Sequence, residues 1–378
     1  MHKIYPYQNI LHPYIKPAFQ SRAIPFTGQN TDETAEISRI ASQISKEELE
    51  KYLNELAGSK TEGRGVGQRG IETAKEYIAE RFKEYGLKPV NHLGLDNYYE
   101  TFSMPKYSLE SIKKGQYTKG ELDRFKLLPP KVETANILGM IEGTEKPDEY
   151  IIISAHYDHL GKNDYHIFPG ANDNASGVVG LLEIARILSQ EKAPKKSIIF
   201  AALSGEESGL YGARKLSQDI IAKGIAQKVK ILNLEMLASM KGETLDIWDQ
   251  DKKEVQNIVS NVIKTADHFG IKTNQIHDKA GPPADSMEFN QNKIPAVTAI
   301  WDSKLNEIYK NHPTLHTTED TPKNANKQTL YEATRVLASA INLLANETSD
   351  KSELSFTSNR LLELNAYKQK ALNLRKIV

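Results

Sequence analysis

Residues 149–159 read EYIIISAHYDH, a continuous β-branched run that ends in two histidines and an aspartate. An apolar run without alternation predicts a strand that is buried on both faces of a parallel sheet. Further runs of this kind predict strands over 197–203, 231–237 and 295–301. Apolar residues at helical spacing predict helices over 178–188, 255–269 and 330–344. This alternation predicts an α/β fold with a mainly parallel, doubly wound mixed sheet flanked by helices.

Polar side chains follow these strands, at the edge where open parallel sheets bind their ligands. His156 and Asp158 alternate on the extended segment after the first strand, so they project to the same face. Asp158 can there fix the tautomer of the His156 ring while the other ring nitrogen binds a metal. A single histidine after a strand is more often structural, but the His-x-Asp pair favours a metal ligand.

Two acidic residues stand side by side in the segment SGEESGL, residues 204–210. Adjacent carboxylates repel each other unless a cation or a proton lies between them. The simplest interpretation makes Glu207 a metal ligand and Glu206 a general base. The competing interpretation is an acidic first turn of a helix, which the helix dipole favours.

Two further acids belong to the candidate site. Asp173 lies in PGANDNASG, residues 169–177, and is predicted to bridge two metal ions about 3.5–4 Å apart. Turn and capping chemistry could also explain this segment, although capping would need only one of the three residues Asn172 to Asn174. Glu235 lies within an apolar strand, and because a glutamate is almost never buried unpaired, it is predicted to bind the same metal centre.

A second histidine follows the last predicted strand, in HPTLHTTEDT over residues 312–321. With His316, the inventory is two histidines, three carboxylates and one spare glutamate. Imidazole and carboxylate ligands without thiolates favour zinc, with manganese or cobalt as possible substitutes. The sequence therefore predicts a site for two zinc ions per chain.

At these residues the sequence resembles the two-zinc aminopeptidases that share a fold with glutamate carboxypeptidase. The resemblance covers about residues 136–344 and consists of five motifs in the order of that family. It implies one zinc on His156 and Glu235, a second on Glu207 and His316, Asp173 as the bridge and Glu206 as the base. It also implies that Asp158 and Asp285 lie behind the ligands His156 and His316, respectively.

The resemblance implies a zinc-dependent exopeptidase, most readily an aminopeptidase that removes N-terminal residues from peptides through a metal-bound water activated by Glu206. A carboxypeptidase or dipeptidase on the same scaffold is a rival, but it would need a cation for the substrate carboxylate. Arg214 is the nearest candidate, and a structural or solvated role is expected for it. A single-zinc glutaminyl cyclase and a non-catalytic binding protein with the same fold are two further rivals.

One residue departs from the family pattern. Glu235 stands where the family usually has aspartate, so its side chain is one methylene longer. A glutamate can still bind a metal, but it must retract or change its mode of binding. The sequence therefore does not decide how fully the His156 site is occupied by metal or how fast the enzyme turns over. A centre with a single well-occupied zinc is also conceivable.

The remaining sequence limits the possible partners and divides the chain. The 378 residues carry a formal net charge of zero, without a basic block that would indicate nucleic acid. Residues 1–20 contain no continuous apolar core, which predicts neither a signal peptide nor a membrane span. Because similar enzymes are exported, a secreted or periplasmic location with a replaced leader is favoured, and a cytoplasmic one stays open.

We expect four segments along the chain. They are an irregular arm over 1–40, a helical extension packed on the core over 41–130, a catalytic domain over 131–346 and a tail over 347–378. Within the extension, a capping box of Ser45 and Glu48 predicts the start of one helix, and a second is predicted over 71–82. The glycine-rich segment 63–67 between them is interpreted as a connector, because no strand precedes it.

Overall fold

The computed structural model describes residues 31–107, 109, 130–248, 253–277, 284–303 and 308–347. Their main feature is an eight-stranded sheet with the order β1-β2-β6-β3-β7-β10-β8-β9. Its strands are β1 (Tyr99–Pro105), β2 (Lys131–Ile141), β3 (Lys146–His156), β6 (Lys196–Leu203), β7 (Val229–Glu235), β8 (Leu245–Trp248), β9 (Thr273–Ile276) and β10 (Ala296–Trp301). A separate hairpin pairs β4 (Gly161–Lys162) with β5 (Ile167–Phe168).

The four central strands are parallel. β6 pairs with β3, β3 with β7, and β7 with β10, all in parallel register. Antiparallel pairs flank this centre, β1 with β2, β2 with β6 and β10 with β8, while β8 and β9 are parallel. The prediction of a mainly parallel mixed sheet is therefore confirmed, and the carboxyl ends of β6, β3, β7 and β10 lie at one edge.

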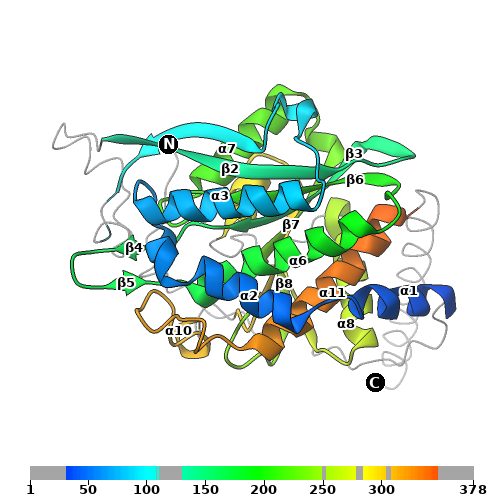
Figure 1. Ribbon diagram of the computed structural model, residues 1–378. Helices are drawn as coiled ribbons and strands as arrows, with labels where there is room; N and C mark the ends of the chain where they lie inside the picture. Colours follow the sequence, from blue (N-terminus) through cyan, green and yellow to red (C-terminus); the bar gives the residue numbers. More distant parts are fainter. Residues whose placement is uncertain are drawn as a thin grey trace, which may run out of the picture. The chain divides into compact units, whose positions relative to one another are not determined.

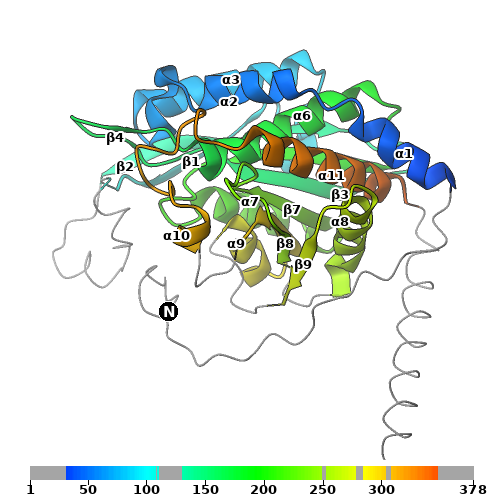
Figure 2. The same ribbon diagram turned by 90° about the horizontal axis from the view of Figure 1, so that it is seen from below.

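Helices cover both faces of the sheet (Figures 1 and 2). They are α1 (Thr31–Ala41), α2 (Lys46–Leu56), α3 (Arg69–Glu84), α6 (Ser176–Gln190), α7 (Tyr211–Ala222), α8 (Gln256–His268), α9 (Asp285–Gln291), α10 (Ile308–Asn311) and α11 (Lys327–Asn346). Short turns of 3-10 helix are η1 (Ser59–Arg64), η2 (Asn91–Leu93), η4 (Ala226–Lys228) and η5 (Lys253–Val255). Residues of α2, α3, α6, α8 and α11 share one apolar cluster with the sheet, and residues of α7 and α9 share the other.

The central strand β3 shows why the deciding apolar run has no alternation. Ile151 and Ile153 pack into the cluster on one face, whereas Tyr150 and Ile152 pack into the cluster on the other. All four are buried. Burying one such aliphatic side chain stabilises the fold by roughly 1.5–3 kcal/mol, so each face of β3 contributes.

The chain before the sheet differs from expectation in two ways. The segment from Thr31 was expected to be irregular, but it forms α1, whose Ile37 and Ile40 are buried. The region 41–130 was expected to be helical, yet it also supplies the edge strand β1. Both features depend on contacts with distant residues, which local propensity does not reveal. Residues 1–30 lie outside the described residues, and so does the predicted tail after Glu347.

The helix start predicted at Ser45 is met, with one change of hydrogen-bond partner, and the helix predicted over 71–82 lies within the longer α3. Ser45 caps α2 and its hydroxyl accepts the Glu48 backbone N–H at 3.1 Å. The reciprocal bond of a capping box is made by Glu183 of α6 instead, whose Oε1 accepts the Ser45 N–H at 2.8 Å. This exchange ties α2 to α6.

Among the described residues, no helix combines the length and apolarity that crossing a membrane requires.

Candidate metal centre

Most of the predicted site residues lie at or after the ends of four neighbouring strands, and Asp173 lies in the segment Ala171–Ala175 before α6. His156 ends β3, Glu235 ends β7, and the turn after β6 carries Glu206 and Glu207. His316 lies in the segment that follows β10 and α10. Because β6, β3, β7 and β10 are parallel neighbours, these side chains meet at one edge of the sheet.

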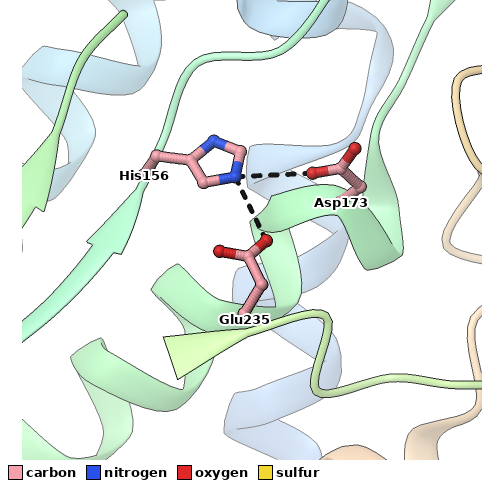
Figure 3. Close-up of side chains that lie close together, drawn as sticks. All are labelled: His156, Asp173 and Glu235. Atoms are coloured by element: carbon pink, nitrogen blue, oxygen red, sulfur yellow. Dashed lines mark hydrogen bonds and ion pairs between the residues drawn. The ribbon is translucent and has the colours of Figure 1, made fainter. Parts of the chain in front are cut away.

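The first half of the site consists of His156, Asp173 and Glu235 (Figure 3). His156 Nε2 lies 3.2 Å from Glu235 Oε1 and 3.4 Å from Asp173 Oδ1. All three side chains are buried. The prediction that Glu235 is buried with a partner in the site is met, and the three residues could hold a metal ion.

The second half of the site uses the other oxygen of Asp173. His316 Nε2 lies 3.1 Å from Asp173 Oδ2 and 3.3 Å from Glu207 Oε2. His159 also reaches this half, with Nδ1 2.7 Å from Glu207 Oε1 and 3.7 Å from Asp173 Oδ2. The two oxygens of Asp173 thus face two different sets of ligand atoms, as a carboxylate that bridges two metals must.

Buried acids strongly change the pKa of both imidazoles. Burial alone would lower the pKa of His156, but Glu235 and Glu206 raise it well above its ordinary value. Burial would also lower the pKa of His316, and Glu207 with Asp173 raises it well above its ordinary value. The arrangement attracts positive charge. A divalent cation satisfies the same acids and displaces the protons from its ligands.

The loop of Asp173, Ala171–Ala175, is held from several sides. Asp320 accepts the backbone N–H groups of Asn172 and Asp173 at 2.9 and 3.0 Å. Asn172 Oδ1 accepts the Ala238 N–H at 3.0 Å, and Asn174 Oδ1 accepts the Met236 N–H at 3.1 Å. The three consecutive polar residues therefore have separate tasks, because Asp173 faces the site while the asparagines fix the loop to the chain after β7.

Asp158 orients the site in a way that differs from the prediction. His156 Nδ1 lies 3.1 Å from the backbone carbonyl of Asp158 and 3.8 Å from its carboxylate. The carbonyl therefore places the proton on Nδ1 and directs Nε2 towards the acids. The Asp158 carboxylate instead accepts the Glu206 N–H at 3.1 Å, so it positions the backbone of the predicted base.

Asp285, expected behind His316, lies on the other side of the site. Burial raises its pKa to about 8, and the charges that act on it belong to His156, Glu235, Asp158 and Glu288. These neighbours place it beside the His156 half. The sequence motif located Asp285 near the centre but did not reveal which half of the site it approaches.

Three residues at the site were not predicted. His159 reaches the Glu207 half, Asp320 holds the Asp173 loop, and Arg64 is fully buried behind both loops. Arg64 donates to the carbonyls of Leu56, Tyr157, Pro169 and Gly170 at 2.6–2.8 Å. It joins the His156 loop to the Asp173 loop, and an arginine within the glycine-rich segment 63–67 was the one signal for it.

Glu235→Asp is expected to lower zinc occupancy on the His156 side and to slow turnover. The aspartate would retract the carboxylate by about 1.5 Å, whereas ligand distances in a metal site vary by only about 0.2 Å. The expectation is checked by measuring zinc per chain and the peptidase rate of this variant. The control is Glu243→Asp, the same substitution at an exposed position. Unchanged stoichiometry with a higher rate would contradict it, and unchanged values in Glu235→Ala would remove Glu235 from the site.

Comparisons with known proteins show the family of the chain. The model of a family described as "Peptidase family M28" matches residues 136–341, more than half of the chain. A "Probable zinc metalloprotease" of Pyrenophora teres f. teres is 30% identical over 237 residues, 60% of this chain and 47% of that protein. The chain thus spans about half the length of the curated relatives it matches.

Two solved structures share the fold at low identity. A zinc aminopeptidase from Bacillus subtilis superposes with a TM-score of 0.63 at 15% identity, covering 82% of this chain and 97% of that one. A glutaminyl cyclase from Porphyromonas gingivalis gives a TM-score of 0.59 at 16% identity, covering 80% and 99%. At these identities the likeness establishes the fold, and the fold is shared by both activities.

Proposed function

The chain belongs to peptidase family M28, and within it we propose a two-zinc aminopeptidase that removes N-terminal residues from peptides. The main observation behind this proposal is the position of the Asp173 carboxylate. Its Oδ1 lies 3.4 Å from His156 Nε2, and its Oδ2 lies 3.1 Å from His316 Nε2. His156 and Glu235 would hold one zinc, and Glu207 and His316 the other. The donor set of imidazoles and carboxylates suits zinc.

Bound zinc would supply Lewis-acid polarisation of the peptide carbonyl and lower the pKa of a water molecule. Glu206 is the group that moves protons. Its Oε2 lies 4.0 Å from His156 Nε2, beside the ligands but outside both ligand groups. Burial raises its pKa well above the ordinary value, and Glu207, Asp285 and Glu235 raise it further. Such a carboxylate can take a proton from the attacking water and return it to the leaving amine.

The charge of the site supports amino-terminal cleavage. Glu206 and Glu235 are acids on the His156 side, and they would complement the ammonium group of a free peptide N-terminus. Arg214, the candidate cation for a carboxypeptidase, pairs with Glu288 at 3.3 Å and donates to the Gly209 carbonyl at 3.2 Å. Its role is structural, as expected, so the described residues favour recognition of an amine.

Apolar side chains adjoin the ligands. Met236 follows Glu235 directly, and it packs with Trp248 and Ile300 in a cluster that Leu315, the residue before His316, also contacts. We expect a substrate side chain beside the metal ligands to approach the partly buried Leu315 of this cluster. Peptides with an apolar first residue are therefore the appropriate test substrates.

The rival functions have less support. A single-zinc cyclase would need only one of the two ligand groups, whereas both are assembled here around Asp173. A non-catalytic binding protein would not need the partly buried Glu206 beside the ligands. Both rivals would follow from the fold alone, but the arrangement of the side chains favours hydrolysis.

A peptide that begins with leucine is expected to be shortened from its first residue, and its N-acetylated counterpart to resist cleavage. The reason is that acetylation removes the ammonium group that the acids of the site would bind. Mass spectrometry of both reactions with the zinc-loaded protein checks the expectation. Shortening from the carboxyl end would show a carboxypeptidase, and cyclisation of N-terminal glutamine without hydrolysis would show a cyclase.

A further inference from the structure

His159 is a buried histidine that the ligand set implied by the resemblance leaves unused. It is 1% exposed, and its Nε2 has no hydrogen-bond partner among the described residues, while its Nδ1 faces only carboxylates in the contacts that the structure shows. His312, a second buried histidine nearby, shows the contrast. Its Nδ1 lies 3.1 Å from Asn172 Nδ2, and its Nε2 lies 3.0 Å from the Trp301 carbonyl. Where His312 meets an amide and a backbone carbonyl, His159 Nδ1 meets two acids that belong to the proposed metal centre, so its role has to be sought there.

The position of the His159 ring is that of a metal ligand. Nδ1 lies 2.7 Å from Glu207 Oε1 and 3.7 Å from Asp173 Oδ2, so it faces the same two carboxylates as His316. Two ligands at about 2.0–2.2 Å from one zinc lie roughly 3–3.5 Å apart in a tetrahedral arrangement. The distances at His159 and those at His316, 3.1 and 3.3 Å, fall around this value. Both rings, 5.7 Å apart between centroids, therefore converge on the same two carboxylates.

The surrounding backbone holds the His159 ring in this position. The ring lies against Gly170, where an added Cβ would come within 2.4 Å of its Cγ and Cδ2. The His159 N–H donates to the Arg64 carbonyl at 3.3 Å, and the Arg64 guanidinium donates to the Gly170 carbonyl at 2.8 Å. Arg64 thus fixes the chain on both sides of the ring. Only glycine at 170 leaves room for it.

We propose that His159 Nδ1 is a further ligand of the zinc that Glu207 and His316 hold. This metal then has four protein ligands, His159, His316, Glu207 and Asp173 Oδ2, whereas the metal on the other side has His156, Glu235 and Asp173 Oδ1. The inference rests on the proposed metal centre but not on the direction of cleavage. It also implies unequal sites, in which a chelator removes zinc first from the His156 side.

Cobalt binding to His159→Cys tests the assignment directly. The chain contains no cysteine, so a thiolate-to-cobalt charge-transfer band in the near ultraviolet must come from the introduced residue. We expect this band in His159→Cys after cobalt replaces zinc. The control is His166→Cys, at an exposed position before β5, and it should bind cobalt without the band. Full cobalt binding by His159→Cys without the band would overturn the proposal.

A second measurement needs no substitution in the site. X-ray absorption of the unsubstituted protein with both zinc ions bound should show three imidazole ligands over two metals, and two would overturn the proposal. In His159→Ala, zinc affinity at one site should fall by more than about 100-fold, because loss of a group that only supports a ligand typically lowers affinity 10–100-fold. A smaller loss would contradict direct binding. If the unsubstituted protein bound no metal, the proposed function itself would fail.

Discussion

Glu206→Gln is expected to lower kcat for peptide hydrolysis by about 10²–10⁴-fold, the usual contribution of a general base. The amide keeps the size of the side chain but cannot take a proton from the attacking water. Zinc content and folding should remain unchanged, because Glu206 belongs to neither group of ligand atoms. Its backbone N–H, held by Asp158 at 3.1 Å, is also unaffected by the substitution.

The adjacent acid provides the matched comparison. Glu207 Oε2 lies 3.3 Å from His316 Nε2, so Glu207→Gln should lose zinc as well as activity. Rates with saturating peptide, zinc per chain and the circular dichroism spectrum would be measured for both variants. Near-normal turnover of zinc-loaded Glu206→Gln would exclude Glu206 as the base, and loss of zinc from this variant would make it a ligand instead.

The different roles proposed for these two neighbours were inferred from the sequence by elementary electrostatics. Two adjacent carboxylates need a cation or a proton between them, and the buried Glu235 needs a partner. The uninterrupted run over 151–153 predicted a strand buried on both faces, and the clusters on both sides of β3 have this arrangement. Local signals of this kind predicted the sheet, its ligand edge and five side chains that the structure brings together.

The positions of Asp158 and His159 were predicted less well, because the alternation of side chains holds only within a strand. Alternation placed His156 and Asp158 on one face, but β3 ends at His156 and the chain then turns. Beyond that point the Asp158 carboxylate reaches the Glu206 backbone, and His159 reaches Glu207. A rule of period two cannot describe residues after the strand has ended, so the partner of Asp158 and the position of His159 were missed.

Long-range contacts account for the remaining differences. Arg64 binds the carbonyl of Tyr157, 93 residues away, and Asp320 binds the backbone of Asp173, 147 residues away. Neither segment carries a local pattern that names its partner. Burial lowers the pKa of Arg64 to about 10, although the surrounding acids Asp320, Asp173 and Asp158 act to raise it. Such a residue becomes recognisable only after the loops have been assembled around it.

Asp173→Ala is expected to have the largest effect on metal binding, weakening both zinc sites by more than about 100-fold and abolishing hydrolysis. This exceeds the 10–100-fold typical of residues that only support a ligand. His156 and His316 each lie within 3.4 Å of a different oxygen of this one carboxylate, so its removal deprives both metals of a ligand. His316→Ala should weaken only one site, since Asp173 Oδ1, His156 and Glu235 stay in place.

The fold of the Asp173 loop should survive this substitution, which makes the comparison informative. Asp320 binds the backbone N–H of residue 173 rather than its side chain, and Asn172 and Asn174 hold the flanking positions. Chelator titration of both variants, with circular dichroism as the folding control, measures the two affinities separately. If Asp173→Ala kept one zinc as tightly as the parent, Asp173 would be a terminal ligand of a single metal. The assignment of Asp173 as a bridging ligand would then be wrong. The site would instead be a single-zinc centre, a possibility that the glutamate at position 235 already raised.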